Sequence, residues 1–124
     1  MSSAVPKQLM LQDLFATIDA MDATAFAGFL TDDAHFRFGS TPAVRGKAAI
    51  AEAVATFLSS IAALRHSVDF VTSQANVLVA EGSVNYTRHD GSQIALPFAD
   101  VFTMDGSKIS NYKIYMDIAP LYAE

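Results

Sequence analysis

The sequence predicts an α+β domain in which the helices lie to one side of an antiparallel meander. In the first half of the chain, apolar residues recur at helical spacing. From His66 onward they alternate with period two, as in half-buried strands. Asp90-Gly91 and Asp105-Gly106 interrupt this second half, and Asp-Gly pairs suit tight hairpin turns. The predicted order is helix, helix, strand, helix and four strands, within a single domain over residues 1–124.

The composition narrows the classes of function. With 52% hydrophobic and 17% charged residues the chain is globular rather than disordered. The net charge of −5 and the lack of Lys/Arg clusters argue against a nucleic-acid partner. No apolar run approaches the roughly 18 residues of a membrane span, and the first residues lack the apolar core of a signal peptide. Without cysteine, we expect a cytoplasmic protein with no disulfide or thiol chemistry.

Helical periodicity defines the first elements. The spacing predicts a first helix from about Pro6 to Met21, and Asp22 is expected to cap a short second helix whose apolar stripe includes Phe29 and Leu30. The segment 34–38 alternates with period two and is predicted to be a short strand, followed by a loop over residues 39–46. A third helix is expected after Gly46.

The second half is predicted to form four paired strands. The first covers residues 66–72, and a turn at 73–76 leads into a long strand over 77–88. A two-residue turn at Asp90-Gly91 would place Glu81 opposite Asp100. A second two-residue turn at Asp105-Gly106 would place Asp100 opposite Asn111.

This register assigns side chains to two faces of the sheet, because successive residues of a strand point to opposite sides. One face mixes aromatic and acidic side chains, namely those of Phe98, Asp100, Phe102, Tyr115 and Asp117. The other is nearly all apolar and carries Tyr86, Tyr112, Ile114 and Met116. A sheet with two such faces requires a cover on each side.

Four stretches in this order resemble a known family: FLTDDAHFRFG, VRGKAAIAEAV, VNYTRHDG and LPFADVFTMDGSKISNYKIYMD. Together they resemble the nuclear transport factor 2-like superfamily and, within it, the SnoaL-like proteins. The resemblance implies a cone, in which a curved antiparallel sheet of about four to six strands wraps around three N-terminal helices and encloses a pocket. It also implies a homodimer, which we expect to form through the face with Tyr86, Tyr112, Ile114 and Met116.

The strongest candidates for chemistry are Asp100 and Asp117. Acids on strands are most often hydrated near an edge. Asp100, however, lies between Phe98 and Phe102 and, in the predicted register, opposite Glu81, which would raise its pKa into the range useful for proton transfer. The resemblance agrees: in ketosteroid isomerases an acid matching Asp100 stabilises a developing oxyanion, and in limonene epoxide hydrolases an acid matching Asp117 acts as a base on water.

Two histidines and one tyrosine are further candidates. His35 and His66 lie at strands that lead to the pocket, and either could pair with Asp117 as a general base and acid. The alternative for each is a structural histidine that donates to a backbone carbonyl. Tyr115 could donate a hydrogen bond to a ligand, against the alternative of plain packing. The histidines lack metal-ligand spacing and there is no glycine-rich phosphate loop, so we expect no metal and no cofactor.

The chain departs from every catalytic set of the superfamily. Leu14 stands where the isomerases have a tyrosine, Phe38 where they have a base, and Asn85 where the epoxide hydrolases have an aspartate. We expect these three residues, with Phe98, Phe102 and Tyr115, to line the pocket. Two functions therefore stay open. One is a cofactor-independent isomerase, cyclase, dehydratase or hydrolase that acts on a small apolar or aromatic molecule by carboxylate acid-base chemistry. The other is a non-catalytic ligand-binding or dimerisation module.

Overall fold

The computed structural model describes the backbone of residues 4–123 and the side chains of residues 9–123. It is an α+β fold, as the sequence predicts. The elements in chain order are α1 (Ala4–Asp19), α2 (Ala23–Ala27), β1 (Leu30–Phe38), β2 (Val44–Arg45), α3 (Lys47–Ser59), β3 (Ala63–Gln74), β4 (Val77–Thr87), β5 (Gln93–Asp105), β6 (Lys108–Tyr115) and α4 (Ala119–Tyr122).

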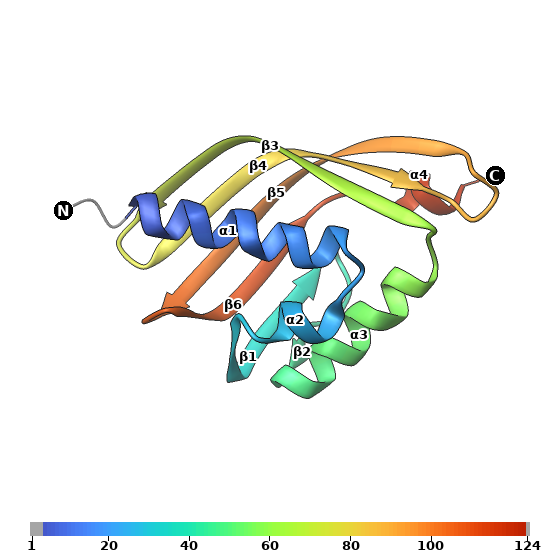
Figure 1. The fold of residues 1–124 in the computed structure, drawn as a ribbon. Helices are drawn as coiled ribbons and strands as arrows, with labels where there is room; N and C mark the ends of the chain where they lie inside the picture. Colours follow the sequence, from blue (N-terminus) through green and yellow to red (C-terminus); the bar gives the residue numbers. More distant parts are fainter. Residues whose placement is uncertain (1–3, 124) are drawn as a thin grey trace.

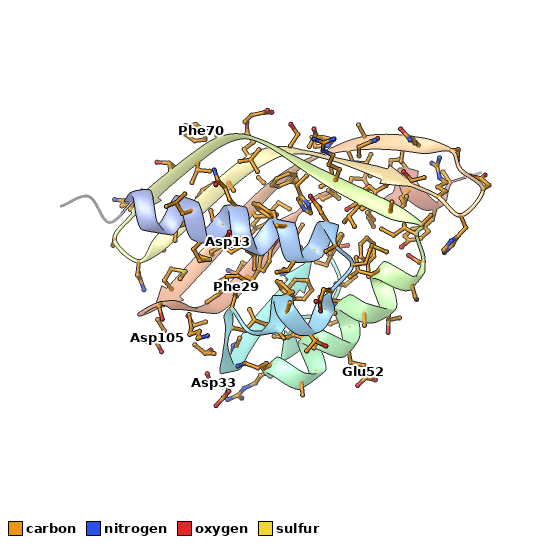
Figure 2. The ribbon with its side chains drawn as sticks, in the orientation of Figure 1. Asp13, Phe29, Asp33, Glu52, Phe70 and Asp105 are labelled. Carbon is orange, nitrogen blue, oxygen red and sulfur yellow. The ribbon has the colours of Figure 1, made fainter. Side chains whose placement is uncertain are left out.

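The six strands form one curved, open sheet in the order β2-β1-β6-β5-β4-β3. All neighbours are antiparallel except β1 and β6, which run parallel. Figure 1 shows the long strands arching over α1, with α2 and α3 on the same side of the sheet. The core fills the space between the concave face and these helices (Figure 2). This is the cone implied by the resemblance.

The helices and the short elements follow the predicted pattern with three local differences. Asp22 caps α2 as expected, since its Oδ1 accepts a hydrogen bond of 3.0 Å from the Ala25 N–H. Leu30, however, begins β1 instead of ending the helix, because it pairs with Ile109 of β6 and both side chains are buried. The short elements β2 and α4 were not predicted.

The β4–β5 hairpin differs from the prediction by one residue. Its loop has three residues, because the Arg88 N–H donates to the Ser92 carbonyl at 2.8 Å and Gly91 adopts a φ of +88°. The prediction of a two-residue turn at Asp90-Gly91 was therefore wrong. A slip of one residue moves every side chain of a strand to the opposite face. Asp100 now pairs with Ala80, and Glu81 pairs with Ala99.

The β5–β6 hairpin differs in two ways. Asp105 pairs with Lys108, so the turn begins one residue later than predicted. Ser110 is then an extra residue on β6, since Met104 pairs with Ile109 whereas Thr103 pairs with Asn111. The bulge reverses the facing of the rest of β6, which is the physical reason for the corrections that follow.

The predicted dimer face is consequently the inner face of the sheet. Tyr86 is 2% exposed and Tyr112 is 1% exposed, and Ile114 and Met116 are packed against the core. These side chains cannot form a subunit interface, so that prediction was wrong.

Candidate functional site

A cavity of about 310 Å³ lies between the concave face of the sheet and the helices. Its walls are largely aromatic and aliphatic. Phe57 packs at 5.2 Å from Phe38 and at 6.0 Å, edge to face, from Tyr86. The polar side chains on the wall are those of Thr41, His66, Tyr86, Asp100, Tyr112 and Tyr122. A cavity of this size with few polar groups has the character of a small-molecule site.

Asp100 is the buried acid of this cavity. Its position on β5 turns the side chain inward, where it is 1% exposed. The Tyr112 hydroxyl donates to Asp100 Oδ2 at 3.0 Å, and Oδ1 has no hydrogen-bond partner among the described residues. Burial raises the pKa of Asp100 to about 8, although the bond from Tyr112 acts in the opposite direction. The carboxyl group is therefore mostly neutral at pH 7.

This raised pKa was predicted, but part of the predicted cause was wrong. The prediction relied on burial among aromatic residues and on a neighbouring charge at Glu81. Glu81 is exposed on the opposite face of the sheet, because of the three-residue hairpin loop. Burial is the main cause.

His66 on β3 forms the second polar group of the cavity wall. Its Nδ1 lies 2.6 Å from Oδ1 of Asp19, the last residue of α1, and its backbone N–H donates to the same carboxylate. The ring stacks on Phe15 at a centroid distance of 4.6 Å and contacts Phe98 edge to face at 5.6 Å. With one nitrogen held by a carboxylate, the other nitrogen is the acceptor. A neutral imidazole with its proton on Nδ1 carries its acceptor lone pair on Nε2.

The structure brings together only part of the predicted site. Asp100, His66, Phe98 and Phe38 lie on the cavity wall, as expected. Leu14 and Phe102 are fully buried in the core and do not line the cavity. Asn85 is exposed and bonds to the Gln93 side chain, because the β4–β5 slip turns it outward. His35 is exposed on β1, on the side opposite to Phe36.

The predicted facing of Asp117 and Tyr115 was also wrong. Tyr115 is 56% exposed and Asp117 is exposed, because the bulge at Ser110 reverses their side of the sheet. Asp117 Oδ1 instead accepts a hydrogen bond of 3.1 Å from the Ala119 N–H. The two residues border a separate surface depression that shares Phe38, Thr41, Met116 and Ile118 with the cavity wall.

Residues of the site that sequence reasoning missed include Asp19, Tyr86 and Tyr112. Asp19 is 47 positions from His66, and nothing local to either residue indicates that they meet. The two tyrosines were assigned to the wrong face. The phase of the apolar residues on β6 could have corrected Tyr112, since the step from Ile109 to Tyr112 breaks the period of two.

The end of the chain borders the same cavity. Arg88 donates from Nε to the Leu121 carbonyl at 2.8 Å and from Nη2 to the Pro120 carbonyl at 3.0 Å. Tyr122 and Ser60 share a hydrogen bond of 2.8 Å between their hydroxyl groups. These contacts hold α4 at one end of the sheet (Figure 1) and bring Tyr122 to the cavity wall.

Within residues 4–123, no group of three or more His, Cys, Asp or Glu side chains is arranged to hold a metal ion. No helix in that part of the chain has the length and apolar character needed to cross a membrane.

Comparison with known proteins gives a family match and a common fold. The sequence-family model that describes the SnoaL-like domain matches residues 11–112. A nuclear transport factor 2-like protein of unknown function from Burkholderia pseudomallei superposes with a TM-score of 0.82 at 14% identity, over 92% of each chain. TerC, co-crystallised with polyporic acid, superposes at 0.81 and 18% identity, over 94% of this chain and 95% of that chain. A putative SnoaL-like polyketide cyclase from Jannaschia gives 0.79 and 15% identity, over 90% and 85%. No curated protein matches the chain.

Proposed function

Because the chain belongs to the SnoaL-like domain family, we propose that its cavity binds a small, largely apolar molecule and transfers a proton on it without a cofactor. One observation carries the proposal. A neutral buried carboxyl group at Asp100 and a carboxylate-held imidazole at His66 line the same aromatic cavity. An acid and a base with separate environments in one pocket are the usual requirement for acid-base catalysis.

His66 acts as the base in this proposal. Asp19 holds Nδ1–H at 2.6 Å, so the lone pair of Nε2 is free to accept a proton from the ligand. As His66 becomes positively charged, Asp19 stabilises the imidazolium. The stacking of the ring on Phe15 fixes its direction.

Asp100 acts as the acid in this proposal, through the proton of its neutral carboxyl group. Since Tyr112 donates to Oδ2, the carboxyl proton resides on Oδ1, the oxygen without a partner among the described residues. A hydrogen bond from Oδ1–H would stabilise negative charge that develops on a ligand oxygen, and such stabilisation is strong in an apolar cavity. The pair suits reactions that begin with removal of a proton close to a carbonyl or hydroxyl group. Isomerisation, cyclisation and dehydration begin in this way.

The names of two similar structures mention a ligand or an activity. One of them was crystallised with polyporic acid, and another is described as a putative polyketide cyclase. At identities of 18% and 15% they share the fold alone. The substrate class is therefore argued from the cavity of this chain, whose walls are aromatic and whose polar groups are few.

The first test is a screen of aromatic and terpenoid compounds, scored for product and for a rise in melting temperature. Once a converted compound is found, His66→Gln is expected to lower kcat by about a hundredfold, the typical contribution of a general base. Asp19→Asn is expected to lower it less, because the ring stays in place but loses the charge that stabilises the imidazolium. The rate should also fall as the pH rises through about 8, where Asp100 loses its proton.

His35→Gln is the matched control, because His35 is an exposed histidine of β1 outside the cavity. It should retain the wild-type rate. Compounds that raise the melting temperature without being converted would favour the second function, a ligand-binding module. Full turnover by His66→Gln would exclude His66 as the base.

We also propose that two copies associate through the outer face of the sheet. The register places Phe70, Glu81, Ala99 and Tyr115 in one row across β3, β4, β5 and β6. Phe70 and Tyr115 are 55% and 56% exposed, and Figure 2 shows Phe70 on the side of the sheet away from the helices. Two exposed aromatic residues, separated by Glu81 and the small Ala99, suit a two-fold contact in which each ring covers the partner's sheet and the two Glu81 side chains reach solvent at its edge.

Phe70→Asp is the test of this interface. The variant would place one buried carboxylate from each chain in the interface, which opposes association. Light scattering at micromolar concentration should therefore give the mass of two chains for the wild type and of one chain for the variant. Glu52→Lys changes a charge on α3, far from this face (Figure 2), and should leave the dimer intact. A wild-type monomer at that concentration would contradict the proposal.

A further inference from the structure

Tyr86 has a polar group that the proposed reaction does not use. The residue lies on β4 with its ring on the cavity wall, and it is 2% exposed. Among the described residues, the hydroxyl has one hydrogen-bond partner, the thioether Sδ of Met116 at 3.4 Å. A thioether is a weak acceptor. The hydroxyl therefore has a partner that a ligand oxygen can readily replace.

The surroundings keep this hydroxyl a donor. Burial raises the pKa of Tyr86 far above its ordinary range, and the nearby Asp100, Tyr122 and Asp19 add to the rise. Tyr86 therefore stays protonated at any physiological pH. It can donate to a ligand but cannot serve as a base.

The charge of the cavity restricts the ligand. The lining contains no Lys or Arg among the described residues, and Asp19 lies directly behind His66. A ligand that enters as an anion would meet no Lys or Arg, and burying such a charge is costly in an apolar site. The weakly bonded hydroxyl of Tyr86 and the unpartnered Oδ1 of Asp100 instead match a neutral acceptor oxygen. The aromatic walls match a ring.

We infer that Tyr86 is a specificity-determining residue, whose hydroxyl leaves Met116 and donates to an acceptor oxygen on a neutral, ring-shaped ligand. This inference rests on the proposed function, because it assigns the ligand class of the same cavity. A site built to bond an oxygen rejects the analogue that lacks it, since its buried donor is then poorly satisfied. The cavity should therefore prefer a ketone to the matching hydrocarbon.

Matched pairs of two- and three-ring compounds provide the test: 1-tetralone and tetralin, 2-acetylnaphthalene and 2-ethylnaphthalene, fluorenone and fluorene. The two compounds of each pair have similar shapes, but only the ketone carries an acceptor oxygen. With the wild-type protein, calorimetry should give about tenfold tighter binding of the ketone, as expected for one added hydrogen bond in a buried site.

Two variants assign this preference to Tyr86. Tyr86→Phe keeps the ring and removes the hydroxyl, so the ketones should lose about tenfold in affinity while the hydrocarbons are unchanged. Met116→Leu removes the partner of the hydroxyl in the empty cavity, so the ketones should bind a few-fold more tightly. Tyr115→Phe removes an exposed hydroxyl outside the cavity and should change neither.

The outcomes separate this inference from the proposed function. Equal affinity for ketone and hydrocarbon in the wild type would overturn the role of Tyr86 and leave the proposed binding of apolar molecules intact. A preference for ketones that persists in Tyr86→Phe would also overturn it. Binding of neither member of any pair to the wild type would overturn both proposals.

Discussion

Asp100→Asn is expected to stabilise the protein, by an amount that grows with pH. In the wild type the pKa of Asp100 is about 8 when folded and near 3.8 when unfolded. Between these values the unfolded chain binds fewer protons than the folded protein. The wild-type free energy of unfolding therefore falls by up to about 1.4 kcal/mol per pH unit. Asparagine does not titrate, and its carbonyl can still accept the bond from Tyr112. The variant should thus gain roughly 5 kcal/mol over the wild type by pH 8.

Urea unfolding at a series of pH values from 4 to 9 measures this difference. The difference between variant and wild type should be small at the acid end, rise steadily and level off above about pH 8. Asp13→Asn removes one charge from an exposed position of α1 and reports the effect of the charge alone. A pH-independent difference for Asp100→Asn would show that Asp100 is not held neutral by burial.

A stabilised Asp100→Asn variant would also bear on function. A buried, poorly satisfied acid costs stability, and proteins keep such groups where activity requires them. If the variant is more stable but inactive on a compound that the wild type converts, the cost is explained by the role proposed for Asp100.

Gly82→Ala is expected to destabilise the protein severely. At Gly82, in the middle of β4, the backbone of β3 approaches so closely that an added Cβ would lie 2.0 Å from the Ser67 carbonyl oxygen. The same Cβ would lie 3.0 Å from the Ser67 carbonyl carbon and from Val68 Cα. These are backbone atoms of a paired strand that bulges just beyond Val68, so they cannot rotate away. The free energy of unfolding should fall by about 3 kcal/mol or more.

Gly106→Ala is the matched control for this substitution. Gly106 lies in the β5–β6 turn with a φ of +61°, and an added Cβ meets nothing within 4 Å. Its cost should be about 1 kcal/mol, from the left-handed backbone alone. Chemical denaturation of both variants separates the two causes. Equal losses would mean that the close approach of β3 to β4 is not rigid.

The fold could be predicted from the sequence because its signals are local. The apolar spacing of α3 and the cap at Asp22 each depend on residues within a few positions. The alternation along β4 and β5 is local as well, so the strands were found even where their partners were not. The element order then limited the topology to a helix layer on one sheet.

The site could be predicted only in part, because it depends on register. Asp100 and His66 were identified from residue type and neighbourhood, and both line the cavity. The predicted facing of Asp117 and Tyr115 was wrong because the strand pairing was extrapolated from the turns. A single misplaced residue reverses the facing of every residue beyond it. The contact between Asp19 and His66 is tertiary, since it joins the end of a helix to a distant strand.

The extra residue at Ser110 has a consequence for how proteins of this fold change their ligands. Ser110 changes which residues of β6 face inward. Before it, Ile109 packs into the core, and after it, Tyr112 and Ile114 line the cavity. If β6 paired without the bulge, with Ser110 opposite Thr103, then Asn111, Lys113 and Tyr115 would face the cavity in place of Tyr112 and Ile114. The formation or loss of one strand bulge can thus replace a binding wall in one step, where point substitutions would need several.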